Sequence, residues 1–273
     1  MKQDSGRAMK FFTYNVNSVN ARLPLILDWV AEAQPDVCAF QELKCIDEKF
    51  PYEAFESLGY NVAVHGQKTY NGVALISKYP LMDVEKGLPG EDEDEQARYI
   101  EAVVDGPVPV RVTSIYLPNG NPIGTDKYAY KHRWYQRLIA RAKDILAYEE
   151  LSILSGDFNT IPFKADLYRE SAWLDDALYQ PETRAAYQTL KNLGYTDAFD
   201  VLPPADNRYT FWDYQAGAWQ KNEGIRIDHH LLSPQAADRL KGFEIHKDAR
   251  GKTHETAKPS DHVPVGVELL TEN

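Results

Sequence analysis

Apolar and polar positions alternate along much of this chain, and the alternation predicts a protein rich in β-strands. Over residues 11–17 the two alternating sets are Phe12, Tyr14 and Val16 against Thr13, Asn15 and Asn17. Successive residues of a strand point to opposite faces, so this segment is expected to bury one face. Similar patterns predict strands at 37–41, 60–65, 72–77, 99–104, 110–116, 151–154, 224–232 and 263–269.

Helical spacing of apolar residues appears between these strands. The expected helices lie at residues 23–34, 128–148 and 184–193. Pro35 ends the first and Gly194 the third, while Trp134 and Leu138 face inward on the second. Because no linker divides the pattern, we expect one mixed α/β domain over 10–273. Residues 1–9 precede the first patterned segment and are expected to form a mobile tail.

Composition narrows the class of protein. The 273 residues are 43% hydrophobic, which is enough for a sizeable core. No apolar run reaches the length of a membrane span, and the start lacks the apolar core of a secretory signal, so a cytoplasmic protein is expected. Two cysteines do not make a disulfide framework. We expect two reduced thiols, with Cys38 in a buried strand and Cys45 at the surface.

The net charge of −11 is unfavourable for a partner rich in phosphates, but charge is unevenly distributed. An acidic run at 91–95 reads as a solvated loop. The expected long helix carries a group of cations that includes Lys131, Arg133, Arg137 and Arg141, and its three arginines share one face by their spacing of four. This cationic face could contact phosphates, or it could be a solvated face paired with nearby carboxylates.

Acidic and amide residues recur at the ends of the apolar strands, far apart in sequence. They are Asn15, Asn17, Glu42, Tyr116, Asn119, Asp157, Asn159, Asp228, Asp261 and His262. Carboxylate and amide oxygens suit a hard cation such as Mg²⁺, which keeps waters for substrate phosphate oxygens. Strand alternation would place Asp157 and Asn159 on one side. Each fragment alone is also typical of a turn or a surface, but the set suits water attack on a phosphodiester.

Eight segments together resemble the motif series of the exonuclease III and AP-endonuclease family. In order they are TYNVNS, PDVCAFQELK, YNGVALISK, IYLPNG, LSGDFNTIP, RYTFWDY, GIRIDHHLLS and KPSDHVPV. The resemblance covers about residues 10–269, and the RYTFWDY and RIDHHLLS block separates it from deoxyribonuclease I, inositol phosphatases and sphingomyelinases. It implies a four-layer αββα sandwich, in which two mixed β-sheets pack face to face with helices outside.

The resemblance also implies a Mg²⁺ site, which Mn²⁺ is expected to occupy as well. Glu42 would be the principal ligand. Asn15, Asp261, Asp157 and Asn159 would complete the set of metal ligands.

The catalytic roles follow from the same resemblance. Asp157 would orient or deprotonate the attacking water, and Asn159 and Tyr116 would contact the phosphate. His262, held by Asp228, would donate to the phosphate and steady its developing charge. Whether Asp157 or the Asp228 and His262 pair is the general base stays open. Substrate contacts are implied for a further set: Asn17, Lys44, Asn119, Lys131, Arg133, Phe211 and Trp212.

The function implied is a DNA repair nuclease that cuts duplex DNA 5′ to abasic sites. Exonuclease activity from the 3′ end and removal of 3′ phosphates would accompany it, in a monomer without a membrane partner. Leu43 replaces a threonine of the bacterial motif, and residues 160–173 depart most, so the balance of these activities is open. The alternatives are an inactive regulator that binds RNA or protein, or a phosphatase or ribonuclease of the wider superfamily.

Overall fold

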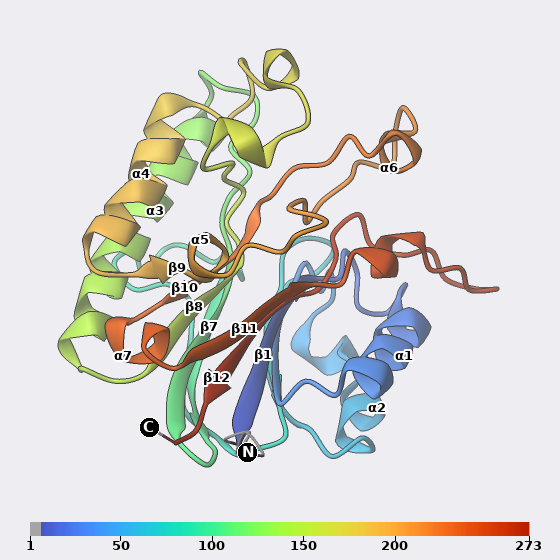
Figure 1. Cartoon of the computed structure of the whole chain (residues 1–273), viewed down its shortest axis with the longest axis vertical. Coiled ribbons are helices and arrows are strands. Elements are labelled where there is room, and N and C mark those ends of the chain that lie inside the picture. Colours follow the sequence, from blue (N-terminus) through green and yellow to red (C-terminus); the bar gives the residue numbers. More distant parts are fainter. Residues whose placement is uncertain (1–6, 273) are drawn as a thin grey trace, which may run out of the picture.

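Two six-stranded β-sheets pack face to face in the computed structural model, which describes residues 7–272 (Figure 1). The first sheet has the order β11-β12-β1-β2-β4-β3 and the second β5-β6-β7-β8-β10-β9. The strands of the first sheet are β1 (Ala8–Asn15), β2 (Val37–Gln41), β3 (Asn61–His65), β4 (Val73–Ser77), β11 (Leu240–Ile245) and β12 (Val265–Leu270). Those of the second are β5 (Leu81–Lys86), β6 (Tyr99–Asp105), β7 (Pro109–Tyr116), β8 (Ser152–Asp157), β9 (Thr196–Asp197) and β10 (Asp228–Leu232).

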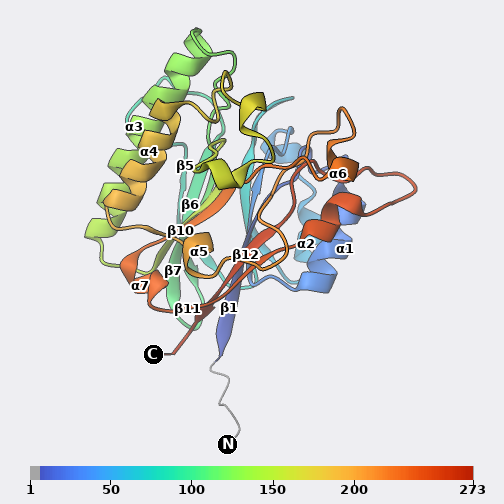
Figure 2. The same ribbon diagram turned by 45° about the horizontal axis from the view of Figure 1, so that its top comes forward.

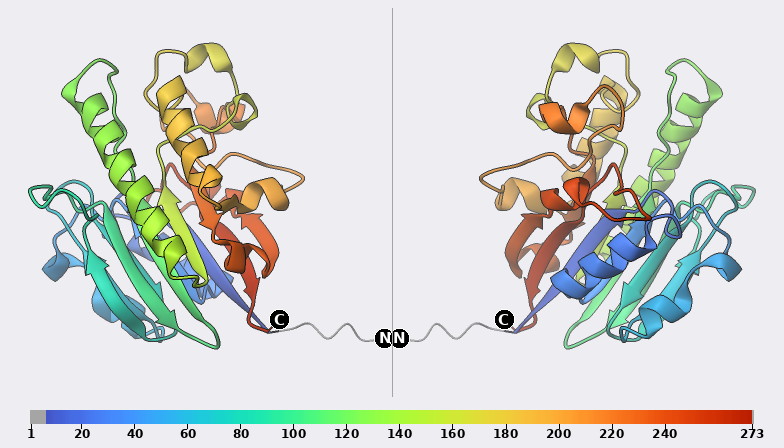
Figure 3. Two further views of the ribbon diagram at one scale, coloured as in Figure 1. Left: turned by 90° about the vertical axis from the view of Figure 1, so that its left-hand side faces the viewer. Right: turned by 90° about the vertical axis from the view of Figure 1, so that its right-hand side faces the viewer.

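Helices cover the outer faces of both sheets. The α-helices are α1 (Leu23–Ala33), α2 (Tyr52–Glu56), α3 (Asp126–Ala147), α4 (Pro181–Asn192), α5 (Ala198–Val201), α6 (Ala218–Lys221) and α7 (Pro234–Ala237). The first two lie against the first sheet, while α3 and α4 run side by side over the second (Figures 1 and 3). The expected four-layer sandwich is confirmed. No helix within residues 7–272 is both long and apolar enough to cross a membrane.

The two faces of β1 bury different kinds of side chain. Phe12 and Tyr14 pack edge-on against Trp29 of α1, with ring centroids 5.2 and 5.6 Å apart. The opposite face places Met9 and Phe11 in the apolar layer between the sheets and continues with Thr13, whose hydroxyl donates to the Gln41 amide oxygen. The space between the sheets therefore changes from apolar to polar along the strand, as the alternation predicted.

Parallel pairing brings the ends of the central strands to one rim. β1 pairs in parallel with β2, and β7 pairs in parallel with β8. β10 runs antiparallel to β8, with Asp228 directly opposite Asp157. The loops that leave these strand ends gather at the same end of the molecule, which is turned toward the viewer in Figure 2. This rim is where the polar residues of the sequence converge.

Several expectations about the elements need correction. β1 begins at Ala8 rather than residue 11, and Met9 is buried opposite Leu269, so neither residue belongs to a tail. Arg7 is also described, and its carbonyl accepts from the Thr271 N–H at 2.9 Å. Residues 1–6 of the expected tail lie outside the described residues. Cys45 is buried rather than at the surface, while Cys38 is buried as expected. The edge strands β5 and β11 were not predicted, because most of their side chains are exposed or half-buried.

A fully buried ionic cluster fixes the segment after β8 to the start of β10. Arg226 donates to both carboxylate oxygens of Asp166, at 3.0 and 3.1 Å, and to Asp197 at 2.8 Å. All three side chains are buried. Burial alone would raise the pKa of Asp197, but the Arg226 guanidinium lowers that pKa to about 2. Because removing one member of a buried pair leaves an uncompensated charge, this cluster is a strong anchor.

We predict that Asp197 makes folding stability depend on pH between about 4 and 2. Its pKa is depressed in the folded protein from the ordinary value of about 3.9, so its contribution is present above that value and is lost as pH falls through 2. The Asp197→Asn variant should be less stable at pH 7. Between pH 4 and pH 2 its free energy of unfolding should fall by about 2 kcal/mol less than that of the unaltered protein. Urea unfolding at several pH values measures the difference. Parallel pH curves for both proteins would contradict the prediction.

Candidate active site

The inner faces of four central strands each end in a polar side chain near the rim. Along each strand the alternate inward positions change from apolar to small or polar and then to the rim residue. The four series are Phe11, Thr13, Asn15; Val37, Ala39, Gln41; Val112, Ser114, Tyr116; and Ile153, Ser155, Asp157. Gln41 also donates to Ser114 across the sheets at 2.9 Å, which ties the two polar layers together. The fold thus delivers polar groups to one place.

An acidic cluster occupies this rim. Glu42, Asp157 and His262 offer ligand atoms that lie within 4.8 Å of one another. The amide nitrogen of Asn15 donates to Glu42 Oε1 and to Asp157 Oδ2, both at 2.9 Å. One side chain therefore holds carboxylates that come from opposite sheets. The oxygens of Glu42 and Asp157 are donors that suit a hard divalent cation, so this cluster fits a metal site.

Glu42 leaves the end of β2 in a left-handed conformation, with φ 53°. Its Oε2 lies 3.1 Å from Lys44 Nζ. Burial alone would raise the pKa of Glu42, but Lys44 and the Asn15 amide lower it. Glu42 is consequently ionised near neutral pH and available to a cation.

His262 lies between two carboxylates of the second sheet. Its Nδ1 is 2.9 Å from Asp228 Oδ2, and its Nε2 is 3.7 Å from Asp157 Oδ2. Burial alone would lower the pKa of His262, but Asp228 and Asp157 raise it to about 10. Burial also raises the pKa of Asp157 strongly, and Asp228 adds to the rise. The cluster therefore combines a protonated imidazole with a carboxyl group that takes up a proton more readily than usual.

Further sequence candidates line the same rim. Burial and the nearby Glu42 carboxylate raise the pKa of Tyr116, whose hydroxyl is therefore protonated. Asn119 Nδ2 donates to Asn159 Oδ1 at 3.3 Å, which brings the two amides together. Asn159 and Asp157 are neighbours for a different reason from the one expected. The strand ends at Asp157, and a turn follows in which the Asn159 N–H donates to Asp157 Oδ1 at 2.9 Å.

Two candidate metal ligands have other duties in the structure. Asn15 turns its amide nitrogen to the carboxylates, and its oxygen accepts from the Asn17 N–H at 3.0 Å. It therefore organises the two carboxylates, and its assignment as a metal ligand stays a prediction. Asp261 accepts from Asn17 Nδ2 at 3.0 Å and lies outside the three-residue cluster. Lys44 also donates to the Asn17 amide oxygen.

The aromatic pair Phe211 and Trp212 divides between the surface and the interior. The half-buried ring of Phe211 packs edge-on against His262, with centroids 4.9 Å apart. Trp212 is fully buried, donates to Asn222 at 3.2 Å and packs against Trp219. Phe211 therefore lies beside the acidic cluster, whereas the burial of Trp212 is unfavourable for the substrate contact expected of it.

The expected cationic face of the long helix is largely neutralised. Arg137 pairs with Asp94 at 2.6 Å, and Arg141 pairs with Glu101 at 2.6 Å. Arg133 is exposed and remains a candidate phosphate contact. Lys131 is fully buried, so it cannot clamp a phosphate backbone from outside. Its spacing of three and seven from Trp134 and Leu138 places it on the buried face, a sequence signal that had been overlooked.

Two residues at the rim were missed by the sequence reasoning. Ser260 donates to the Asn15 carbonyl at 2.7 Å and accepts from the His262 N–H at 3.2 Å, so it joins the first sheet to the segment that carries His262. Its position in the same motif as His262 was the available signal. Arg98 lies over the Tyr116 ring at 4.8 Å and donates to its carbonyl. No local pattern marked Arg98, because this contact depends on strand pairing.

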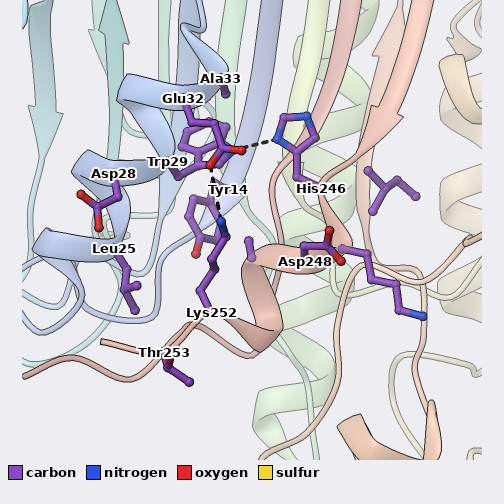
Figure 4. Close-up of a pocket in the computed structure, with 13 residues that line it drawn as sticks. Tyr14, Leu25, Asp28, Trp29, Glu32, Ala33, His246, Asp248, Lys252 and Thr253 are labelled. Carbon is purple, nitrogen blue, oxygen red and sulfur yellow. Dashed lines mark hydrogen bonds and ion pairs between the residues drawn. The ribbon is translucent and has the colours of Figure 1, made fainter. Parts of the chain in front are cut away.

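A cavity lies away from this cluster, between α1 and the segment that follows β11 (Figure 4). It has a volume of about 420 Å³. Trp29 Nε1 donates to His246 Nδ1 at 2.9 Å in its wall, and Glu32 lies 3.5 Å from Lys252 at its side. The metal-ligand cluster is absent from its lining. Side-chain chemistry, rather than cavity size, therefore locates the candidate active site.

The fold and this cluster define the class of protein. The sequence model described as the Endonuclease/Exonuclease/phosphatase family matches residues 12–262, so the chain belongs to that family. Among relatives, it is 34% identical to Exodeoxyribonuclease III of Haemophilus influenzae over 270 residues, which cover 96% of this chain and all of that protein.

Two solved structures are closely similar to this chain. The 3′ phosphatase NExo from Neisseria, bound to a product DNA hairpin, has a TM-score of 0.90 at 38% identity and covers 96% of this chain and 99% of its own. An AP endonuclease from Archaeoglobus fulgidus has a TM-score of 0.88 at 33% identity, with 95% and 98% covered. The fold is therefore shared along nearly the whole length.

In metal-free protein we predict that the His262 ring stays doubly protonated at pH 7.5. Burial opposes this state, but the Asp228 and Asp157 carboxylates stabilise it. Asp228→Asn removes the closer carboxylate and should lower the pKa of His262. NMR titration of the imidazole nitrogens tests this, with the buried His229 and His230 as internal controls that stay neutral at that pH. An unchanged pKa of His262 in the variant would contradict the role of Asp228 in stabilising the protonated ring.

Proposed function

We propose that this chain is a Mg²⁺-dependent DNA repair nuclease. It hydrolyses the phosphodiester 5′ to an abasic site in duplex DNA, and it removes nucleotides or phosphate from 3′ ends. The observation that carries the proposal is the cluster of Glu42, Asp157 and His262, held together by Asn15. The names of the similar proteins support the substrate, since they include an exodeoxyribonuclease, a 3′ phosphatase and an AP endonuclease.

Glu42 and Asp157 are the residues that would hold the metal ion, with Asp261 and the Asn159 amide within the same rim. Mn²⁺ would occupy the same oxygen donors. When bound, the divalent ion supplies positive charge that polarises a phosphate oxygen and offsets charge that develops on it. Most of the positioning is done by the chain itself, through the Asn15 bridge and the Lys44 contact to Glu42.

The protonation states divide the acid and base roles. A protonated His262 has no lone pair free to accept a proton, so it acts as a donor toward the phosphate, oriented by Asp228. Asp157 has a raised pKa and lies 3.7 Å from His262 Nε2. These features favour Asp157 as the group that orients and deprotonates the water, since a base is most effective when its pKa is close to the working pH.

Substrate contacts complete the proposal. The polar groups of Tyr116, Asn119 and Asn159 would contact the same phosphate, a role supported by the contact between the two amides. Phe211 would face an extruded, baseless sugar beside His262, because its ring already packs against that imidazole. Backbone phosphates on either side would meet the remaining candidates, which are Asn17, Lys44 and Arg133. The proposed working form is a cytoplasmic monomer, folded as one domain from β1 onward.

Purified protein should cut a duplex that carries one tetrahydrofuran abasic analogue when Mg²⁺ is present. EDTA should stop the reaction, and Mn²⁺ should restore it, because the ligand oxygens accept either ion. Gel analysis of an end-labelled strand reports both internal cleavage and loss of a 3′ phosphate. Poly(A) and an inositol phosphate serve as comparison substrates. The proposed substrate class would be refuted by folded protein that neither cuts the duplex nor removes the 3′ phosphate, but hydrolyses poly(A) or the inositol phosphate.

Asp157→Asn and His262→Ala should each lower kcat by about 100- to 10,000-fold, which is the usual effect of removing a proton-transfer group or a preorganised donor. Circular dichroism should show a retained fold. The matched control is Asp144→Asn, an exposed carboxylate on α3, which should leave kcat unchanged. Turnover within threefold of the unaltered enzyme in both site variants would contradict the assigned roles.

A further inference from the structure

Lys131 places a buried amino group beneath the active-site rim. It is fully buried on α3, and its Nζ donates to the backbone carbonyls of Asn119, at 3.0 Å, and Asn159, at 2.6 Å. The segments that hold these carbonyls follow β7 and β8, the strands that end in Tyr116 and Asp157. Lys131 thus joins the two loops that carry the proposed phosphate-binding amides.

Within residues 7–272, no carboxylate lies close enough to Lys131 to form an ion pair, so the two carbonyls are its main partners. Burial without a counter-ion lowers the pKa of Lys131 to about 7, and a buried amino group without hydrogen-bond partners is unfavourable. A neutral side chain would pack there at lower cost if filling space were the only requirement. The carbonyl contacts are therefore the chemical reason for a lysine at this position.

The local backbone shows what the two contacts accomplish. Asn159 adopts a left-handed conformation, with φ 42°, and Gly120 has φ 86°. A Cβ at Gly120 would lie 2.6 Å from Lys131 Cδ, so the Asn119 loop can approach the lysine only with glycine there. In these conformations the carbonyls of Asn119 and Asn159 point inward to one Nζ, while their side-chain amides meet at 3.3 Å.

We propose that Lys131 is a positioning residue, which sets the two amides of Asn119 and Asn159 in register so that both reach one substrate phosphate. The inference rests on the proposed function, because it takes these amides as phosphate-binding groups. Lys131 itself does not touch substrate. Its contribution is to fix the end of β7 relative to the end of β8 through α3.

Kinetics of a double-mutant cycle test this role. Lys131→Met keeps the length and bulk of the side chain but removes the donors, and it should lower kcat/KM on the tetrahydrofuran duplex by about 100-fold, the usual effect of a small misplacement. Asn119→Ala should cost much less in the Lys131→Met background than alone, because the amide is already misplaced. Lys131→Arg, which keeps charged donors, should recover most of the lost activity.

The matched control lies one turn further along α3. Tyr135 is also fully buried, and its hydroxyl contacts the Thr160 hydroxyl at 2.8 Å, so Tyr135→Phe loosens the same loop without freeing Asn119. Tyr135→Phe should lower kcat/KM less than threefold. In the double variant with Asn119→Ala, the loss of kcat/KM should equal the product of the two single losses. If the losses of kcat/KM caused by Lys131→Met and Asn119→Ala also multiply in their double variant, the positioning role is overturned. Should Lys131→Met fail to fold, Lys131→Gln takes its place in the cycle.

NMR of the side-chain amides separates this inference from the proposed function. In metal-free protein, the Asn119 and Asn159 amide resonances should both shift in Lys131→Met and keep their positions in Tyr135→Phe. This readout requires no substrate. An enzyme without activity on DNA, combined with coupled amide shifts, would refute the proposed function and leave the geometric coupling intact. Unshifted amides in Lys131→Met would refute the coupling, whatever the activity.

Discussion

The candidate site depends on one neutral amide placed between two carboxylates. Asn15 ends a strand of the first sheet and donates to Glu42 of that sheet and to Asp157 of the second, at 2.9 Å each. Two carboxylates that are brought together where water is scarce repel each other. A lysine or arginine placed between them would reduce the repulsion, but its own charge would have to be desolvated. An amide provides two donors without charge. The carboxylates are therefore held in place while remaining available to a divalent ion.

The same strands explain how much of the fold the sequence could predict. β2 has the bounds predicted for it, because its apolar run is buried from end to end. The edge strands β5 and β11 gave no comparable signal, since mixed exposure weakens alternation and Gly242 lies at a register shift of β11. The gathering of strand ends at one rim depends on sheet order, which local periodicity does not encode. That part of the expectation came from the family resemblance.

Residue type alone does not determine whether a side chain at this site is buried or exposed. Lys131 and Arg133 are both cations on one helix, but the first shares the buried face with Trp134 while the second is exposed. Phe211 and Trp212 are adjacent aromatics whose rings lie in different surroundings, one beside His262 and one in the interior. Helical and strand periods distinguish the members of each pair. Composition and net charge do not distinguish them. Arg137 and Arg141, for example, form ion pairs with the protein's own carboxylates and are not available to a phosphate.

The segment around β10 combines three separate constraints. Arg226 anchors Asp166, Asp228 orients His262, and the buried ring of His229 bonds to the Thr160 carbonyl at 3.0 Å. The loop that follows Asn159 is consequently fixed at two points, Thr160 and Asp166, from the same segment that positions the imidazole. Sequence change in the rest of that loop can alter what it presents to a substrate without moving the acidic cluster.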